Sequence, residues 1–342
     1  MKKILLRISL LFIVLAAFIY FFSKNLPSIQ KALNVTLSES LETLVFSIVF
    51  FALGYMFLSY MNITLFQMTK IRRTLGAMII LRMSSLAANA LIPSGGLTAG
   101  FMFADDAKDR GESGAAAVTS FLLSLVVDYT STVVLLMVAM AYLASRELLG
   151  PVIIIPAVAY VATTFGLFML IYFSSKNKPA LQKFLDRVRT ILNRALRFFK
   201  VKPIGDDNAI SNFVNELEGA YISLRNDPRD IYIAFAYMFL AHSMFLTALY
   251  ILFLSFGISL PLLTIVSGYA IGMMVVVISP TANGVGFVEG AMALAYTSMG
   301  VPGATAITIA IIFRLFSFWL PMLGGFIALQ RKHLLAVIRL KK

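Results

Sequence analysis

Four charged side chains lie inside long apolar stretches of this sequence, and their types suit them to chemistry: Arg82, Asp128, Glu289 and Arg314. A charge in a lipid-like environment is costly, so such residues usually face a protein interior or a water-filled cavity. We expect the two bases and two acids to pair, and ion pairs that only fix helix packing are the alternative. The sharper hypothesis is that Arg82 or Arg314, held in place by an acid, binds a lipid phosphate through two hydrogen bonds.

Two of the apolar stretches are broken by loops rich in proline and glycine. In lipid, irregular backbone is tolerated only where protein covers it or a polar cavity hydrates it. One broken segment in each half of a membrane protein indicates a substrate site near the midplane. The glycine amides could hold an anion at a helix end, or the glycines could simply form tight turns. The loop residues predicted to line the site are Pro93, Gly95, Gly96, Gly100, Pro280, Asn283, Gly284 and Gly286.

An acid cluster offers a different chemistry. Asp105, Asp106 and Asp109 form a D-D-x-x-D pattern, the kind of cluster that holds Mg²⁺ and a diphosphate in membrane prenyltransferases. The alternative is a solvated loop, because basic residues interleave with these acids, and Asp227 and Asp230 are poor candidates for a second cluster. No nucleophile–histidine–acid triad, zinc-binding H-E-x-x-H or phosphate-binding loop is recognisable, and we expect no cofactor.

The composition places these residues in a membrane. The chain has 342 residues, of which 60% are hydrophobic and 13% charged, and its mean hydropathy is +0.88. A soluble domain would carry about 25% charged residues. We therefore expect an all-α polytopic membrane helical bundle, with residues 1–342 forming a single integral membrane domain. Cysteine is absent, which excludes disulfides and thiolate chemistry.

The lengths of the apolar stretches set the predicted topology, because a span needs about 20 apolar residues. The broken stretches, residues 75–103 and 260–300, are expected to be re-entrant helix-loop-helix hairpins. The spans are expected near residues 4–23, 43–62, 115–144, 151–173, 230–256 and 303–330.

The net charge of +13 is concentrated at the two termini and in residues 174–203, where nine basic residues stand against one acid. The positive-inside rule explains these tracts more simply than nucleic-acid binding does. We therefore expect both termini and the loop 174–229 to be cytoplasmic, in a multi-pass protein of the cytoplasmic (plasma) membrane. With that orientation the first hairpin enters from the inside and the second from the outside, as an inverted repeat would produce.

The basic loop also carries an amphipathic pattern. Between residues 179 and 200, apolar side chains recur at three- and four-residue spacing with arginines and lysines between them, which is typical of a helix that lies on an anionic lipid surface. A helix that packs under the bundle is the alternative. A second helix near residues 208–225 is expected to fold back beside it.

Three segments together resemble a known family: Pro93–Gly100, Pro280–Ala291 and Arg314–Gly325. They are similar to the lysylphosphatidylglycerol synthase transmembrane-region family, the flippase-like membrane domain of multiple-peptide-resistance proteins, over nearly the whole chain. Ala282-Asn283 stands where the family commonly has Pro-Gly. The matching positions are Pro280, Gly284, Gly286, Glu289, Arg314, Trp319 and Pro321, with Asp128 a looser match.

The resemblance implies a lipid translocase or flippase-like transporter for phospholipids, including aminoacylated ones, or for another lipid-linked headgroup. The family's aminoacyl-transferase domain is not recognisable in the sequence, so we expect no enzymatic activity. Two alternatives are a membrane enzyme acting on a lipid-linked diphosphate through the acid cluster, and a membrane scaffold that transports nothing. The expected partners are membrane phospholipids and not nucleic acid. The sequence leaves open whether the protein forms a homodimer.

Overall fold

The computed structural model describes residues 41–91, 97–198, 209–279 and 281–339, and every regular element in these ranges is a helix. Five helical stretches are long and apolar enough to cross a membrane, and they coincide with five of the predicted spans. The predicted span 4–23 lies outside the described residues. The five stretches belong to α2 (Leu41–Met68), α5 (Gly114–Ser145), α6 (Pro151–Lys176), α9 (Arg229–Ser255) and the continuous pair α12 (Gly303–Arg314) and α13 (Leu320–Arg339).

Local sequence signals place the ends of two of these helices. Ser113 precedes α5, and its hydroxyl oxygen accepts a 3.2 Å hydrogen bond from the backbone N–H of Ala116. This is the N-cap contact that satisfies an otherwise unpaired amide. Helix α6 follows Gly150 and starts at Pro151, where the missing N–H of proline costs nothing.

The last span departs from a plain α-helix. Between α12 and α13, the residues Leu315–Trp319 form a π-helical turn. Such a turn inserts one extra residue into the helical repeat, and it occurs frequently at functional sites. Here the insertion comes immediately after Arg314, one of the four intramembrane charges.

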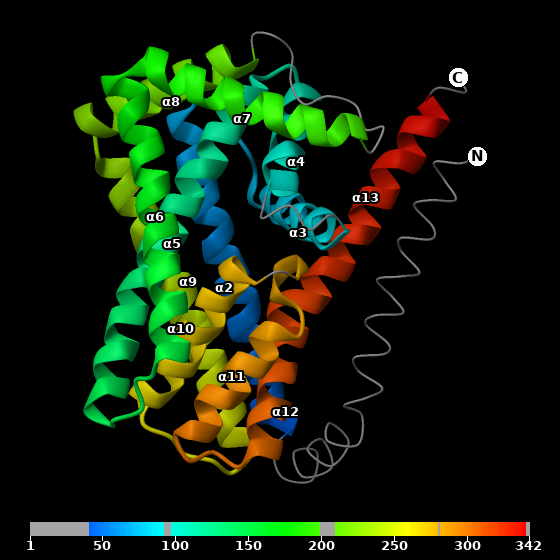
Figure 1. Ribbon diagram of the computed structural model, residues 1–342. Coiled ribbons are helices and arrows are strands. Elements are labelled where there is room, and N and C mark those ends of the chain that lie inside the picture. Colours follow the sequence, from blue (N-terminus) through cyan, green and yellow to red (C-terminus); the bar gives the residue numbers. More distant parts are fainter. Residues whose placement is uncertain (1–40, 92–96, 199–208, 280, 340–342) are drawn as a thin grey trace.

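Two helical hairpins complete the bundle. The first consists of α3 (Leu75–Leu91) and α4 (Leu97–Lys108). The second consists of α10 (Leu262–Ile278), the short 3₁₀ helix η1 (Ala282–Gly284) and α11 (Phe287–Ser298). Figure 1 shows the two hairpins reaching into the bundle from opposite ends. At 1.5 Å per residue, α3 and α10 are each about 26 Å long and α4 and α11 about 18 Å, all shorter than the roughly 30 Å hydrocarbon core.

The predicted amphipathic helix and its neighbour are both present at one end of the bundle. Helix α7 (Lys178–Phe198) and α8 (Ala209–Asn226) lie across that end (Figure 1), and α8 packs against α5, α6, α7 and α9. On α7, Leu181 is buried whereas Phe184 and Ile191 are exposed. The helix therefore keeps apolar side chains uncovered by the rest of the described chain.

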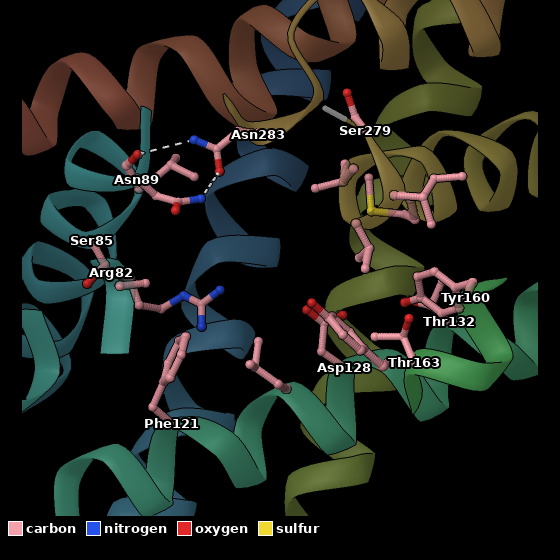
Figure 2. Close-up of a pocket in the computed structure, with 18 of the residues that line it drawn as sticks. Arg82, Ser85, Asn89, Phe121, Asp128, Thr132, Tyr160, Thr163, Ser279 and Asn283 are labelled. Atoms are coloured by element: carbon pink, nitrogen blue, oxygen red, sulfur yellow. Dashed lines mark hydrogen bonds between the residues drawn. The ribbon is translucent and has the colours of Figure 1, made fainter. Parts of the chain in front are cut away.

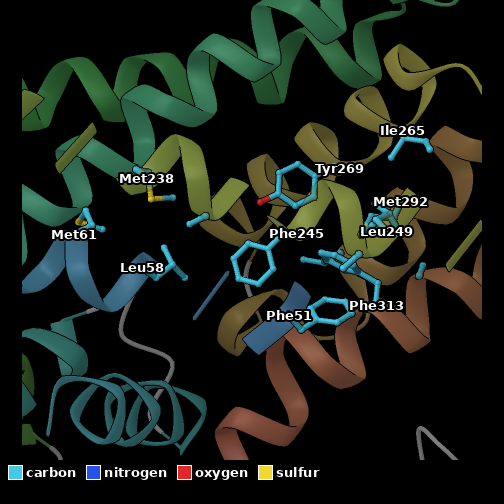
Figure 3. Close-up of a cluster of buried hydrophobic side chains, with 14 of the residues drawn as sticks. Phe51, Leu58, Met61, Met238, Phe245, Leu249, Ile265, Tyr269, Met292 and Phe313 are labelled. Carbon is cyan, nitrogen blue, oxygen red and sulfur yellow. The ribbon is translucent and has the colours of Figure 1, made fainter. Parts of the chain in front are cut away.

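The core that positions these elements is aromatic. The rings of Phe51 (α2) and Phe313 (α12) lie 5.4 Å apart, and Phe245 of α9 packs 6.1 Å from Phe51. Figure 3 shows this cluster where the three long helices meet α10, which contributes Tyr269. A second contact joins α13 to α3, where Gly325 lies directly against the backbone of Met83.

Candidate functional site

The loop of the second hairpin has a backbone that few sequences can adopt. Asn283, Gly284 and Gly286 all have positive φ angles, of 51°, 71° and 83°. Glycine takes this conformation without steric cost, and asparagine tolerates it better than most residues. A side chain at Gly284 would also meet the Cα of Val276, 3.2 Å from its Cβ position. The loop residues predicted from sequence are thus required by the turn itself.

The side chains of Arg314 and Glu289 both form hydrogen bonds with the backbone of this loop. The Nε of Arg314 donates to Glu289 Oε1 at 3.1 Å, and a terminal guanidinium nitrogen donates to the carbonyl of Asn283 at 2.8 Å. The other carboxylate oxygen of Glu289 accepts a 2.8 Å hydrogen bond from the backbone N–H of Gly286. Both side chains are buried, at 5% and 1% exposure. The predicted pairing of intramembrane charges is confirmed for this pair. Besides bonding to each other, Arg314 and Glu289 each bond to the backbone of the loop.

The loop is also bonded to the first hairpin. The side-chain nitrogen of Asn89, near the end of α3, donates to Asn283 Oδ1 at 2.8 Å. Asn283 in turn donates to the backbone carbonyl of Leu86 at 3.4 Å. The last turns of α3 and the loop of the second hairpin therefore meet at one asparagine.

Next to this junction lies a cavity of about 650 Å³. Its walls come from α3, α4, α5, α6, α10 and the η1 loop, and Figure 2 shows polar side chains from both sides turned toward it. A volume of this size is typical of a site for a small molecule or a headgroup. Its polar lining residues are Arg82, Ser85, Asn89, Asp128, Tyr129, Thr132, Tyr160, Thr163, Ser279, Thr281 and Asn283.

Arg82 and Asp128 face this cavity from opposite walls, Arg82 from α3 and Asp128 from α5 (Figure 2). Among the described residues, neither side chain has a hydrogen-bond or ion-pair partner within bonding distance, and Arg82 Nε is buried without an acceptor. The pairing expected for these two charges is therefore not formed. A guanidinium with a buried, unpaired Nε carries a desolvation cost, which an anion in the cavity would offset.

The acid cluster has a structural partner. Arg73, just before α3, donates to Asp106 at 2.9 Å and to both carboxylate oxygens of Glu112 at 3.0 and 2.6 Å. These bonds tie the start of the first hairpin to its end. The hydrogen bond from Arg73 lowers the pKa of Glu112 below its ordinary value. Asp105 and Asp109 are exposed, and the described residues contain no group of three acidic or histidine side chains that could hold a metal ion.

Two other predicted site residues pack helices together. Gly100 is buried on α4, and a Cβ there would touch the ring of Phe121 at 3.4 Å, so it allows close contact with α5. Trp319 is buried with Ala87 in the apolar seam between α13 and α3. Four predicted residues lie outside the described residues: Pro93, Gly95, Gly96 and Pro280.

Much of the polar wall of the cavity could not be predicted from the sequence. Thr132, Tyr160 and Thr163 are uncharged polar residues within strongly apolar helices, which is an ordinary composition for a span. Asn89 stood at the predicted start of the first loop, but nothing in the sequence connected it with Asn283. One sequence signal could have identified the α3 wall of the cavity. Along α3, the cavity-lining residues recur at helical spacing and so share one face: Arg82, Ser85, Leu86 and Asn89.

Two comparisons connect the chain with known proteins. The family described as lysylphosphatidylglycerol synthase TM region matches residues 3–325. The UPF0104 membrane protein PH1989 of Pyrococcus horikoshii is 25% identical over 246 residues, which cover 71% of this chain and 72% of that protein. No solved structure matches the chain.

Proposed function

Because this chain belongs to the lysylphosphatidylglycerol synthase transmembrane-region family, as its motifs indicated, we propose that it moves phospholipid headgroups between the leaflets of its membrane. The observation that carries the proposal is a pair of opposite charges across one cavity, Arg82 and Asp128, neither of which is bonded to another described residue. Arg82 binds the lipid phosphate there, because its fork of donors matches phosphate oxygens. Asp128 receives a cationic group of the headgroup, such as the amine of an aminoacylated phospholipid.

The hairpins account for how such a cavity can exist in lipid. Both are re-entrant in this proposal, and the η1 loop of the second hairpin brings irregular backbone next to α3, where protein covers it or the cavity hydrates it. The Arg314–Glu289 pair holds the η1 loop, and the Asn89–Asn283 bond joins that loop to α3. The cavity then has a fixed wall on the side of the second hairpin.

The acyl chains remain in the bilayer while the headgroup crosses. Helix α6 supplies Thr163 to the cavity, yet most of the same helix presents apolar side chains outward, including Val152, Ile155 and Phe165 at 60–86% exposure. Helix α4 lines the cavity from the other side and packs on α3 and α5, whereas α6 packs on α5, α7, α8 and α10. In this proposal a lipid headgroup enters sideways between α4 and α6, because both helices line the cavity and neither packs extensively on the other.

The orientation follows from charge. Helices α7 and α8 lie across one end of the bundle (Figure 1). The basic segment that holds Arg110 is at that end too, because Ser113 bonds to Glu216 of α8, and Arg73 joins it through Glu112. The positive-inside rule assigns that end to the cytoplasm. The C-terminal end of α13 points the same way in Figure 1. The exposed Phe184 and Ile191 of α7, with Lys183, Arg187 and Arg194 beside them, then lie on the anionic inner leaflet of the cytoplasmic membrane.

The test is leaflet exchange in reconstituted vesicles. The purified protein is placed in liposomes that contain a trace of fluorescent phosphatidylglycerol or its lysyl derivative, and a membrane-impermeant quencher reports how much label reaches the outer leaflet. We expect exchange in vesicles with the wild-type chain and slower exchange with Arg82→Gln. Exchange no faster than in protein-free vesicles for every headgroup tried would refute the proposal.

The same vesicles separate transport from the enzyme alternative. Asp105→Asn removes an exposed acid of the D-D-x-x-D pattern without touching the cavity, so leaflet exchange is expected to be unchanged. No observation favours the diphosphate enzyme as a second candidate function, because Asp106 is bonded to Arg73.

A further inference from the structure

A second cavity, of about 430 Å³, lies on another side of the bundle. Its base is formed by Leu123 and Val126 of α5 and Ile171 of α6, all buried. Phe235 of α9 forms a side wall, and Leu224 and Arg225 of α8 border one end. Helices α6 and α9 both contact α5, and the cavity is the apolar groove that they leave between them under α8.

This groove is separate from the central cavity. On α5, Leu123 and Val126 line the groove, whereas Leu125, Asp128 and Thr132 line the central cavity. At 100° per residue, these two sets fall on nearly opposite faces of the helix. No residue lines both cavities.

The groove lies near the basic end of the bundle. Its α6 residues, from Phe168 to Tyr172, belong to the last turns before Lys176, and its α9 residues begin at Ile231, two positions into the helix. Tyr172 and Tyr221 bring hydroxyl-bearing rings to the same end. Tyrosine is enriched at the level of lipid headgroups, so the groove runs from the headgroup level toward the apolar interior.

One unpaired charge stands at the mouth of the groove. Arg225 is exposed and has no ion-pair partner among the described residues. The neighbouring acids are Asp227, which accepts a 3.0 Å hydrogen bond from the backbone N–H of Arg229, and Asp230 in the first turn of α9. Apart from Arg225 and the two tyrosines, every side chain that lines the groove is apolar.

We propose that this groove is a binding site for one anionic phospholipid of the inner leaflet, with an acyl chain between α6 and α9 and the phosphate on Arg225. An acyl chain is the occupant that matches an apolar groove opening sideways in a membrane, and an arginine at headgroup level supplies the charge complementary to the phosphate. The bound lipid fills the space over Leu123 and Val126, so it supports α5 from the side opposite Asp128. The site goes beyond the proposed transport, because the lipid stays in the groove.

The test is lipid retention by the purified full chain, measured by native mass spectrometry in detergent. The probes are phosphatidylglycerol and phosphatidylcholine with identical acyl chains. We expect the wild type to retain one phosphatidylglycerol in preference to phosphatidylcholine. Arg225→Gln should lower that affinity about fivefold, the factor that one basic residue near an anionic lipid contributes. Leu224→Trp fills the groove and, in an Arg82→Gln background where the central cavity is impaired, should abolish retention of either lipid.

Two controls make the result specific. Arg229→Gln removes the same charge at the same end of the bundle but outside the groove, so it should change affinity less than twofold. The Arg225→Gln effect should also be the same in an Arg82→Gln background, where the central cavity is impaired. Equal losses for Arg225→Gln and Arg229→Gln, or unchanged retention with Arg225→Gln, would overturn the proposal. If Leu224→Trp does not purify, Met169→Trp fills the groove from α6, and full retention in that variant overturns the proposal as well.

Discussion

The side-chain nitrogen of Asn89 lies 2.8 Å from the side-chain oxygen of Asn283, although 194 positions of sequence separate the two residues. Asn89 belongs to the first hairpin and Asn283 to the second. Arg314 holds the carbonyl of the same Asn283 from α12. One residue in left-handed backbone conformation therefore connects both hairpins and the last span beside the central cavity.

The first prediction concerns this bridge. Asn283→Gly keeps the positive φ at no steric cost but removes the side chain, so it should lower the free energy of unfolding by about 1 kcal/mol. Asn89→Ala should cost a similar amount, and the double variant should cost clearly less than the sum, because both changes remove one interaction. Unfolding in mixed detergent micelles measures all three variants. Strictly additive losses would show that the bridge does not contribute.

The second prediction concerns the buried ion pair. Glu289→Gln keeps the size of the side chain but leaves the charge of Arg314 without its carboxylate. We expect a loss of about 3–5 kcal/mol, the usual cost of breaking a buried pair. Glu218→Gln is the matched control, because it breaks the half-exposed pair with Lys178, and exposed pairs contribute at most about 1 kcal/mol. Similar losses in the two variants would contradict the structural role of Glu289.

The third prediction separates function from stability at Arg82. This guanidinium has no bonding partner among the described residues, so Arg82→Gln should leave the melting temperature unchanged or raise it. Leaflet exchange should nevertheless fall about tenfold, as expected when a charged hydrogen bond to the substrate is lost. Arg82→Lys keeps the charge without the two-pronged geometry and should fall in between. If the Arg82→Gln variant exchanges lipid at the wild-type rate, Arg82 does not bind the substrate.

Two adjacent glycines provide the fourth prediction. A Cβ at Gly325 collides with the backbone carbonyl of Met83, whereas a Cβ at Gly324 meets only the flexible sulfur of that residue, at 3.4 Å. Small residues allow membrane helices to approach closely. Gly325→Ala should therefore destabilise the fold by about 1–3 kcal/mol, and Gly324→Ala by less. Thermal unfolding of the two variants measures the difference, and equal melting temperatures would contradict the close packing of α13 on α3.

The fifth prediction is a pH dependence at the base of the first hairpin. The hydrogen bond from Arg73 lowers the pKa of Glu112 in the folded state. The resulting stabilisation is present above the unfolded pKa, which is about 4.3, and is lost as the pH falls through the lower folded pKa. The melting temperature of Glu112→Gln should therefore lie below that of the wild type at pH 7, and the difference should shrink below about pH 4. A constant difference would contradict the ion pair.

Most of the architecture could be predicted from sequence because it depends on local quantities. The length of an apolar stretch decides whether it can span lipid, and this placed α2, α5, α6, α9 and the α12–α13 pair. Proline and glycine mark where helices break, and this located η1 between two short helices. The π-helical turn after Arg314 was not predicted, because it adds a single residue to a helix without changing composition or hydropathy.

Composition and motifs were enough to predict an all-helical membrane protein of one family, with charges that had to be buried and two loops that had to be covered. The role of each charge could be read only from the folded chain, because pairing depends on the distance between helices and not on residue type. Glu289 lies within 3.1 Å of Arg314 and holds a loop. Arg82 and Asp128 are the same kinds of residue, but α3 and α5 place them on opposite walls of a cavity, where a substrate can lie between them.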